Sequence, residues 1–208
     1  MDYLELWLIR HGETDSNKNR RIQGQVDVPL NDLGKEQAQK LAKRIGHMKF
    51  DKIYSSDLSR ALLTAQTSFP KAEIVQDSRL REINLGNYEG RYYDQFSDEE
   101  TAVVKVWFAG PFDQKVPGGE SNDDLHKRAK DWLASLPKSG KVIAFSHGGF
   151  IASLLQTVVG RPEPIPDSRE IPWSFRLGNT SISKVYFKEN STILSVVNDT
   201  AHLELNWD

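Results

Sequence analysis

At 208 residues, with 38% hydrophobic residues, nine phenylalanines and five tryptophans, the chain is long enough to bury a continuous core and is typical of a globular protein. The formal net charge of −2 argues against a nucleic-acid partner, which requires a positive surface. The absence of cysteine excludes disulfides, thiolate catalysis and cysteine-ligated metals. No apolar stretch approaches the roughly 20 residues of a membrane-spanning helix, and residues 1–5 lack the basic start of a secretory signal. We therefore expect a cytoplasmic protein without a membrane partner.

The first half of the chain alternates between predicted strands and helices. Residues 4–9 are a short, mostly apolar run without a helical period, which is typical of a buried strand. After a polar loop, Asn31 or Asp32 is a candidate N-cap for a helix with regularly spaced apolar residues. Residues 53–55 predict a second strand, and residues 57–69 predict a helix that ends before a proline.

The second half continues this alternation and closes with a hairpin. A predicted helix starts near Ser121 and is followed by a strand at residues 141–145. Two glycines break that strand, and residues 150–159 predict one more helix. Residues 182–187 and 192–197, separated by four polar residues, predict a terminal hairpin.

This order of elements predicts an α/β fold formed as a single domain by residues 1–208. We expect a three-layer α/β/α sandwich with a mostly parallel, mixed central sheet. Residues 88–119 interrupt the rhythm with aromatic and acidic side chains and predict a partly helical excursion. This lid-like excursion is either a packed connecting subdomain or a cover over the active site, and the sequence leaves both open. The proline-rich residues 161–172 predict a loop.

Two histidines occupy matched positions in this pattern. His11 and His147 each follow an apolar strand and precede a glycine, so both imidazoles should meet at the carboxyl edge of the sheet. A single histidine of this kind is more often structural, but the matched pair favours a functional site. Gly12 and Gly148 allow backbone N–H groups to approach a ligand, and a helix starting after Gly149 offers its positive end to an anion.

Two arginines add charge at the same edge. Arg10 precedes His11, and Arg60 lies in the first turns of a predicted helix, where the helix dipole disfavours a cation by roughly 0.3 to 1 kcal/mol. A bound anion would reverse that penalty, and each guanidinium can hold a phosphate in bidentate fashion. The alternative for Arg60 is a surface ion pair with Asp57, and the spacing alone favours neither.

The polar loop after His11 contains neutral hydrogen-bonding side chains. Thr14, Asn17 and Gln23 are suited to complete a phosphate-binding shell, and ordinary capping of the loop explains them equally well.

Taken together and in order, the motifs of nearly the whole chain resemble those of the histidine phosphatase superfamily, which has the phosphoglycerate-mutase-like fold. The matching segments are residues 8–14 with Asn17, 23–24, 29–30, 33–34 with 37–38, 53–58 with 60–61 and 64–65, 80–82 with Gly86 and 89–90, 117–121, 146–149 and 198–203.

The resemblance implies a chemistry for these residues. It implies that His11 is the phosphorylated nucleophile and that Arg10, Arg60 and His147 bind the transferring phosphoryl group. It also implies that Glu82 is the proton donor and acceptor, a role that nothing else in the sequence indicates. We expect protonated His147 to neutralise phosphoryl charge, burial to hold Glu82 protonated, and neither a metal nor a cofactor to be required. The expected partner is a small phosphomonoester.

A phosphoglycerate mutase of the same family is the nearest alternative to a phosphatase. A mutase must also hold a carboxylate and a second phosphate, which requires more cations. Here Ile83 follows Glu82 where the mutase branch has an arginine, and Arg91 is the only arginine between Glu82 and Lys127. The sequence thus favours a hydrolase, and its length and its ending at residues 198–203 resemble the broad-specificity and alpha-ribazole-phosphate phosphatase branch. The aromatic excursion suggests a substrate with a hydrophobic or ring-containing body.

Other classes fit the sequence less well. A catalytically silent phosphate-binding regulatory module would not need every polar residue that the family pattern expects. A metallohydrolase would need a histidine cluster that is absent, and a serine hydrolase would need Ser146 within a Gly-x-Ser-x-Gly turn. His47 and His126 are expected on helices, and His202 is expected to be structural. The sequence leaves a homo-oligomer open.

Overall fold

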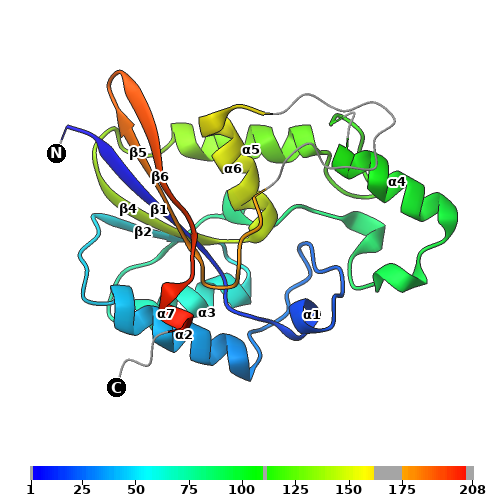
Figure 1. Cartoon of the computed structure of the whole chain (residues 1–208), viewed down its shortest axis with the longest axis horizontal. Helices are drawn as coiled ribbons and strands as arrows, with labels where there is room; N and C mark the ends of the chain where they lie inside the picture. The colour runs from blue at the N-terminus through cyan, green and yellow to red at the C-terminus, as the bar shows by residue number, and fades with distance from the viewer. Residues whose placement is uncertain (1, 110–111, 162–174, 205–208) are drawn as a thin grey trace.

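The computed structural model describes residues 2–109, 112–161 and 175–204, and its centre is a six-stranded sheet. The strands lie in the order β3-β2-β4-β1-β5-β6 (Figure 1). Strands β1 to β4 are parallel to one another, whereas β5 runs antiparallel to β1 and pairs with β6 as a hairpin. The mixed, mostly parallel sheet is therefore confirmed. The strands are β1 Leu4–Arg10, β2 Lys52–Ser55, β3 Val75–Gln76, β4 Gly140–Ser146, β5 Ile182–Lys188 and β6 Ser191–Asp199.

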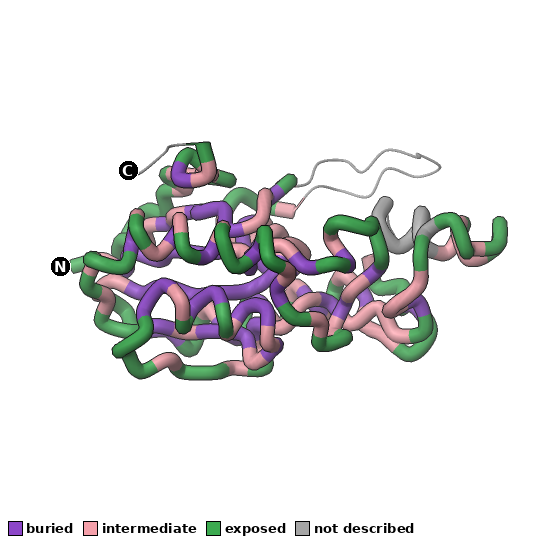
Figure 2. Tube along the Cα trace, turned by 90° about the horizontal axis from the view of Figure 1, so that it is seen from below, coloured by how far each residue is buried: buried purple, intermediate pink, exposed green. Residues whose placement is uncertain are grey.

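Helices cover both faces of the sheet and confirm the three layers. Helices α5 (Asn122–Ala134) and α6 (Gly148–Val159) pack on one face, and α2 (Asp32–Ile45) and α3 (Ser59–Ser68) pack on the other (Figure 1). Each interface holds a cluster of buried apolar side chains, so the buried positions run along the sheet and the helix sides that face it (Figure 2). Burial of this apolar area is the main force that holds the layers together.

Most predicted boundaries agree with the structure to within a few residues. Asn31 is the N-cap of α2, and its side chain accepts a hydrogen bond from Gly34 N at 2.8 Å. Helix α6 starts two residues earlier than predicted. Pattern reasoning missed β3 and the four-residue helices α1 (Asp15–Lys18) and α7 (Ala201–Glu204), because such short segments show no hydrophobic period.

The excursion over residues 88–119 is partly helical, as predicted. It contains α4 (Asp98–Ala109) and forms the lobe that extends beyond the end of the sheet (Figure 2). Its base packs on the core through buried Tyr88, whose ring lies 5.1 Å from that of Phe96. Most of the predicted proline-rich loop lies outside the described residues. In the described part of the chain, no helix combines the length and apolarity needed to cross a bilayer.

The strand register creates the functional edge. Arg10, the last residue of β1, pairs in register with Ser146, the last residue of β4. Ser55 ends β2 beside Phe145 of β4. The residues that follow these three parallel strands therefore emerge together at one edge of the sheet, where the two predicted histidines were expected.

Candidate active site

His11 is a buried neutral imidazole with a defined tautomer. Its side chain is almost fully enclosed, and Nδ1 lies 2.6 Å from the carbonyl oxygen of Gly12. A carbonyl only accepts, so Nδ1 carries the proton and donates it. Burial lowers the pKa of His11 well below its ordinary value, and the nearby charges of Arg10 and Arg60 lower it further. The neutral ring therefore presents an unprotonated Nε2.

The backbone around His11 is held by residues from distant parts of the chain. The carbonyl oxygen of His11 accepts hydrogen bonds from Thr180 N at 3.2 Å and from Asn179 Nδ2 at 3.0 Å. The next amide, Gly12 N, donates to Thr64 Oγ1 at 3.1 Å. Thr180 has a φ of 55°, which is uncommon for a β-branched residue and costs about 1–3 kcal/mol. The fold thus accepts local strain beside the loop that carries His11.

His147 follows β4, and its ring centroid lies 5.1 Å from that of His11. Its Nδ1 accepts a hydrogen bond from Arg60 Nε at 3.2 Å, so a neutral ring carries its proton on Nε2, which donates to Ser56 Oγ at 2.9 Å. Burial lowers the pKa of His147 well below the ordinary value, and Arg60 adds to this effect. In the free chain this ring is therefore neutral, and the expectation that a protonated His147 neutralises phosphoryl charge stays a prediction for the substrate complex.

Arg60 is fully buried in the first turn of α3. Its Nη2 and Nη1 donate to the carbonyl oxygens of Gly24 at 2.7 Å and Val26 at 2.9 Å. Burial lowers its pKa to about 10, so the guanidinium remains charged at neutral pH. Asp57 forms an ion pair with Arg81 instead. The alternative of a surface pair between Arg60 and Asp57 is thus wrong.

Arg10 is held more loosely. Its Nη1 donates to the carbonyl oxygen of Leu177, but its buried Nε has no acceptor among the described residues. A buried donor without a partner costs roughly 1–3 kcal/mol, and more where the group is charged. Gly148 lies beside this nitrogen. A Cβ atom on Gly148 would be 3.6 Å from Arg10 Nε. An anion at this place would satisfy the unpaired donor.

The carboxylate of Glu82 lies at the N-terminus of α6. Oε2 accepts from Gly149 N at 3.0 Å, and Oε1 accepts from Phe150 N at 3.1 Å and Ile83 N at 3.0 Å. The anion that the sequence predicts at this helix end is therefore, in the free chain, the protein's own carboxylate. Glu82 is half-buried, and the proton-donor role that the resemblance implies for it stays a prediction. Its charge acts on both Arg10 and Arg60.

The neutral donors of the polar loop mainly hold the loop itself. Thr14 and Asn17 form a reciprocal capping box at α1. Gln23 accepts a hydrogen bond from Thr14 Oγ1 at 2.6 Å, and Asn17 Oδ1 accepts one from Asn179 Nδ2 at 3.2 Å. The capping interpretation is therefore confirmed for Asn17, while a substrate-binding role for Asn17, Gln23 and Gly148 stays a prediction. Among the described residues, no group of His, Cys, Asp or Glu side chains is arranged to hold a metal ion.

Sequence reasoning missed four residues of this site. Ser56 could have been found by the rule that located the histidines, since it directly follows β2 at the same sheet edge. Thr64, Asn179 and Thr180 carry no comparable signal, because their roles depend on contacts between segments far apart in the chain.

The chain matches the profile of the Histidine phosphatase superfamily (branch 1) over residues 6–200. The chain belongs to the histidine phosphatase superfamily. A "Probable phosphoglycerate mutase GpmB" of Escherichia coli (strain K12 / DH10B) is 35% identical over 97% of this chain and 95% of its own.

Solved structures of the superfamily also include phosphatases. A mutant phosphoserine phosphatase of Entamoeba histolytica in complex with phosphoserine has a TM-score of 0.83 and 31% identity, over 96% of this chain and 99% of its own. A putative alpha-ribazole-5'-P phosphatase of Escherichia coli has a TM-score of 0.79 and 26% identity, over 95% and 97% of the two chains. The predicted histidine phosphatase fold is confirmed.

Proposed function

We propose that this histidine phosphatase superfamily member hydrolyses a small phosphomonoester through a phosphohistidine at His11. The observation that carries this proposal is the state of His11, a neutral ring whose Nδ1–H donates to Gly12 and whose Nε2 keeps its lone pair. The unpaired Nε of Arg10 and the buried charge of Arg60 supply the cations for a phosphoryl group.

In the first step, the lone pair of His11 Nε2 forms a bond to phosphorus while the bond from phosphorus to the leaving oxygen breaks in line. The leaving oxygen keeps the electron pair of that bond and takes a proton from the Glu82 carboxyl, which takes up this proton when the dianionic phosphoryl group binds beside it. The ring of phosphohistidine is positively charged, and its Nδ1–H continues to donate to the carbonyl of Gly12.

In the second step, water attacks the phosphorus and transfers a proton to the Glu82 carboxylate. The nitrogen–phosphorus bond breaks, and its electron pair returns to Nε2 of His11. The sum consumes one water and releases an alcohol and inorganic phosphate. Because phosphate monoesters are among the slowest molecules to hydrolyse without a catalyst, two easier steps are a physical advantage.

Fixed positive charge takes the place of a metal in this mechanism. Arg10 and Arg60 neutralise the oxygens of the moving phosphoryl group. A dianionic group beside His147 favours the charged form of its ring, so we infer that this histidine becomes a donor to the phosphoryl group only when substrate binds. Asn17, Gln23 and Gly148 complete the proposed binding shell.

The arginine pairing supports a hydrolase over a mutase. Arg91, the only arginine between Glu82 and Lys127 in the sequence, forms an ion pair with Glu100. Arg81 pairs with Asp57. These cations are therefore already neutralised and less available for the second phosphate and carboxylate of a bisphosphorylated acid. The mutase remains the second candidate because curated relatives carry that name.

A screen for released phosphate tests the proposal. Wild type and His11→Ala would be assayed with p-nitrophenyl phosphate, phosphoserine, 3-phosphoglycerate and alpha-ribazole 5'-phosphate, each with and without EDTA. We expect wild type to release inorganic phosphate from at least one of them at an EDTA-independent rate and His11→Ala to release none. Isomerisation of 3-phosphoglycerate without phosphate release would favour the mutase. Phosphate binding without turnover of any substrate would favour a regulatory module.

A further inference from the structure

We propose that Arg128 of α5 is a positioning residue that holds the peptide segment carrying Glu82 in register with the N-terminus of α6. The proposal rests on the proton-donor role of Glu82 proposed above. Arg128 lies outside the cluster of His11, Arg10 and Arg60, and the mechanism gives it no direct part.

All the hydrogen-bonding capacity of Arg128 is used within the protein. Nε and Nη2 hold the Glu120 carboxylate in a bidentate pair at 3.0 and 2.8 Å. Nη1 donates to the carbonyl oxygens of Arg79 at 2.8 Å and Arg81 at 2.7 Å, and Nη2 also donates to that of Glu82 at 3.2 Å. The five N–H groups of a guanidinium match these five contacts. This side chain is therefore fixed in one orientation and is only 16% exposed.

Arg128 provides hydrogen bonds to backbone carbonyl groups of residues 79–82 that side chains satisfy in place of backbone N–H groups. The carbonyls of residues 79 to 82 follow one another where the chain leaves a short 3-10 helix, and all four accept from side chains. Ser146 Oγ holds the carbonyl of Leu80 at 2.6 Å, and Arg128 holds the other three. Gln25 Nε2 adds a second donor to the carbonyl of Glu82 at 3.0 Å. The segment thus depends on donors from elsewhere to keep its path.

The same guanidinium also borders the place where the Glu82 side chain ends. It lies 5.6 Å from the centre of the Phe150 ring, and the backbone N–H of Phe150 donates to Glu82 Oε1. Glu120, the ion-pair partner, accepts from Asn84 N at 2.8 Å and donates its own N–H to the carbonyl of Asn84 at 2.8 Å. The pair of Arg128 and Glu120 therefore fixes the chain on both sides of Glu82.

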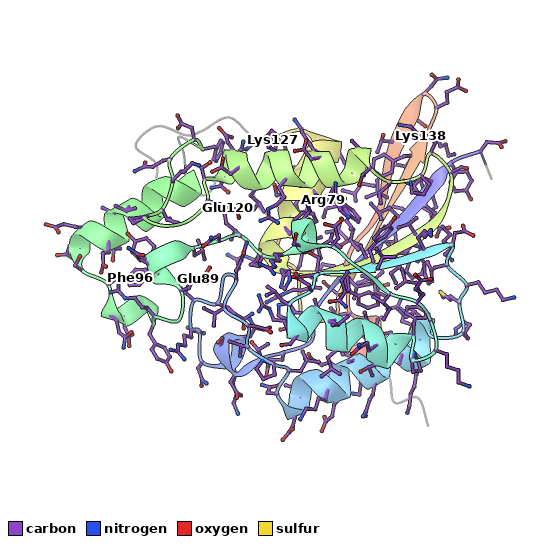
Figure 3. All side chains as sticks on the ribbon, turned by 180° about the vertical axis from the view of Figure 1, so that it is seen from behind. Arg79, Glu89, Phe96, Glu120, Lys127 and Lys138 are labelled. Atoms are coloured by element: carbon purple, nitrogen blue, oxygen red, sulfur yellow. The ribbon has the colours of Figure 1, made fainter. Side chains whose placement is uncertain are left out.

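A purely structural ion pair is the competing explanation, and the chain contains a matched control for it. Arg79 ties the same segment to the same helix, since it donates to the carbonyl oxygen of Asp131 in α5 at 3.4 Å and to Oγ of the C-cap residue Ser135 at 3.1 Å. The side chain of Arg79 makes no contact with Glu82 among those the structure describes. Figure 3 shows Arg79 and Glu120 next to α5, on the side from which the Glu82 segment approaches.

The test compares substrates that differ in their need for a proton donor. p-Nitrophenolate leaves without protonation, whereas the alkoxide of an alkyl phosphate needs a proton. The value of kcat/KM would be measured for p-nitrophenyl phosphate and for the alkyl phosphate that wild type turns over fastest. The value of kcat/KM depends on the steps from substrate binding to cleavage of the ester bond. It does not depend on the later hydrolysis of phosphohistidine. The variants are Arg128→Met, Arg128→Lys, Glu82→Gln, the double variant Arg128→Met with Glu82→Gln, and Arg79→Met.

We expect Arg128→Met to lower kcat/KM for the alkyl phosphate at least tenfold and for p-nitrophenyl phosphate less than threefold. Arg128→Lys restores part of the loss because an ammonium still reaches some of the carbonyls. Adding Arg128→Met to Glu82→Gln costs less than twofold more, since the donor it positions is gone. Arg79→Met changes kcat/KM for the two substrates by the same small factor.

The outcomes separate this proposal from the one on which it rests. If Glu82→Gln lowers kcat/KM for the two substrates by the same factor, the proton-donor role of Glu82 is contradicted. The positioning role of Arg128 is then contradicted as well. If Glu82→Gln discriminates between the substrates while both Arg128 variants do not, only the positioning role is overturned. Arg128→Lys keeps the charge but only some of the five hydrogen bonds, so it should still lower kcat/KM for the alkyl phosphate more than for p-nitrophenyl phosphate. Equal effects of Arg128→Lys on the two substrates overturn the positioning role even where Arg128→Met does not fold.

Discussion

The two active-site imidazoles hold opposite tautomers, and each is set by a neighbour that allows only one. The carbonyl of Gly12 can only accept, so the proton of His11 lies on Nδ1. The Nε of Arg60 can only donate, so the proton of His147 lies on Nε2. In the free chain the ring of His11 thereby presents a lone pair, whereas the N–H of His147 is donated to Ser56 Oγ.

These assignments predict how the histidines titrate. Followed by NMR of the ring nitrogens in the free protein, His11 and His147 should both remain neutral well below pH 6.5, with protons on Nδ1 and Nε2 respectively. Arg60→Met removes a cation that lowers both pKa values, so both titrations should move upward. The larger shift belongs to His147, whose Nδ1 loses its donor. A wild-type His11 that titrates near 6.5, or a His147 that does not move in this variant, contradicts the assignments.

At this scale the sequence identified the charged groups but not their states. The pattern around His11 and the matched glycine after His147 were enough to place both rings and both arginines at one edge. The neutral state of His147 in the free chain could not be predicted, because it depends on Arg60 and Ser56, which the fold brings to the ring from another helix and strand end. Hydrogen-bond partners of this kind are set by tertiary structure and leave no periodic signal.

At the scale of the elements, strand ends and one helix end build the site. The carboxyl ends of β1, β2 and β4 were predictable from apolar runs followed by polar or glycine residues. The group that occupies the N-terminus of α6 was not predictable. The sequence predicted an anionic ligand at this helix end, whereas the structure places the carboxylate of Glu82 at it. Nothing in the local sequence of Glu82 shows that its segment crosses this helix end.

The two glycines that open α6 give a matched test of this contact. A Cβ on Gly149 would lie 2.4 Å from Glu82 Oε1, whereas one on Gly148 would meet no atom closer than 3.6 Å. Gly149→Ala therefore displaces the carboxylate, while both variants replace a glycine by alanine in the first turn of the same helix. Because Gly148 belongs to the proposed binding shell for the phosphoryl group, we expect Gly148→Ala to lower kcat/KM for p-nitrophenyl phosphate and for an alkyl phosphate by the same factor. We expect Gly149→Ala to lower kcat/KM for the alkyl phosphate at least tenfold more than for p-nitrophenyl phosphate. Equal losses of kcat/KM for the two substrates in Gly149→Ala would show that the position of Glu82 does not depend on this helix end.

At the scale of the whole molecule, the layers were predictable and the strand order was not. Alternation of strands and helices predicts a sandwich, but the order β3-β2-β4-β1-β5-β6 depends on which crossovers form. The same holds for the C-terminal end of the described chain, where α7 packs against α2 and brings His202 into the interior. There His202 Nε2 donates to Thr180 Oγ1 at 2.9 Å, and Thr180 N holds the carbonyl of His11. The buried ring of His202 thus supports the backbone at His11 through Thr180.

Burial of neutral histidines makes the stability of the whole fold depend on pH. Burial lowers the pKa of His202 to about 4, with the charge of Arg44 adding to the effect, and the pKa values of His11 and His147 are lowered as well. Between pH 6.5 and 4, the unfolded chain binds protons on these rings that the folded chain does not bind. Stability therefore is fully present above about pH 6.5 and falls as the pH decreases, by about 1.4 kcal/mol per pH unit for each ring.

Urea unfolding between pH 4.5 and 7.5 measures this slope. His202→Gln keeps an N–H donor for Thr180 and an acceptor for Arg44 but cannot take up a proton, so it should reduce the slope by about 1.4 kcal/mol per pH unit in the acidic part of the range. His47→Gln makes the same exchange at an exposed position and controls for the substitution itself. If His202→Gln has the same slope as wild type, His202 takes up its proton without unfolding, and its contact with Thr180 does not hold the neutral ring in place.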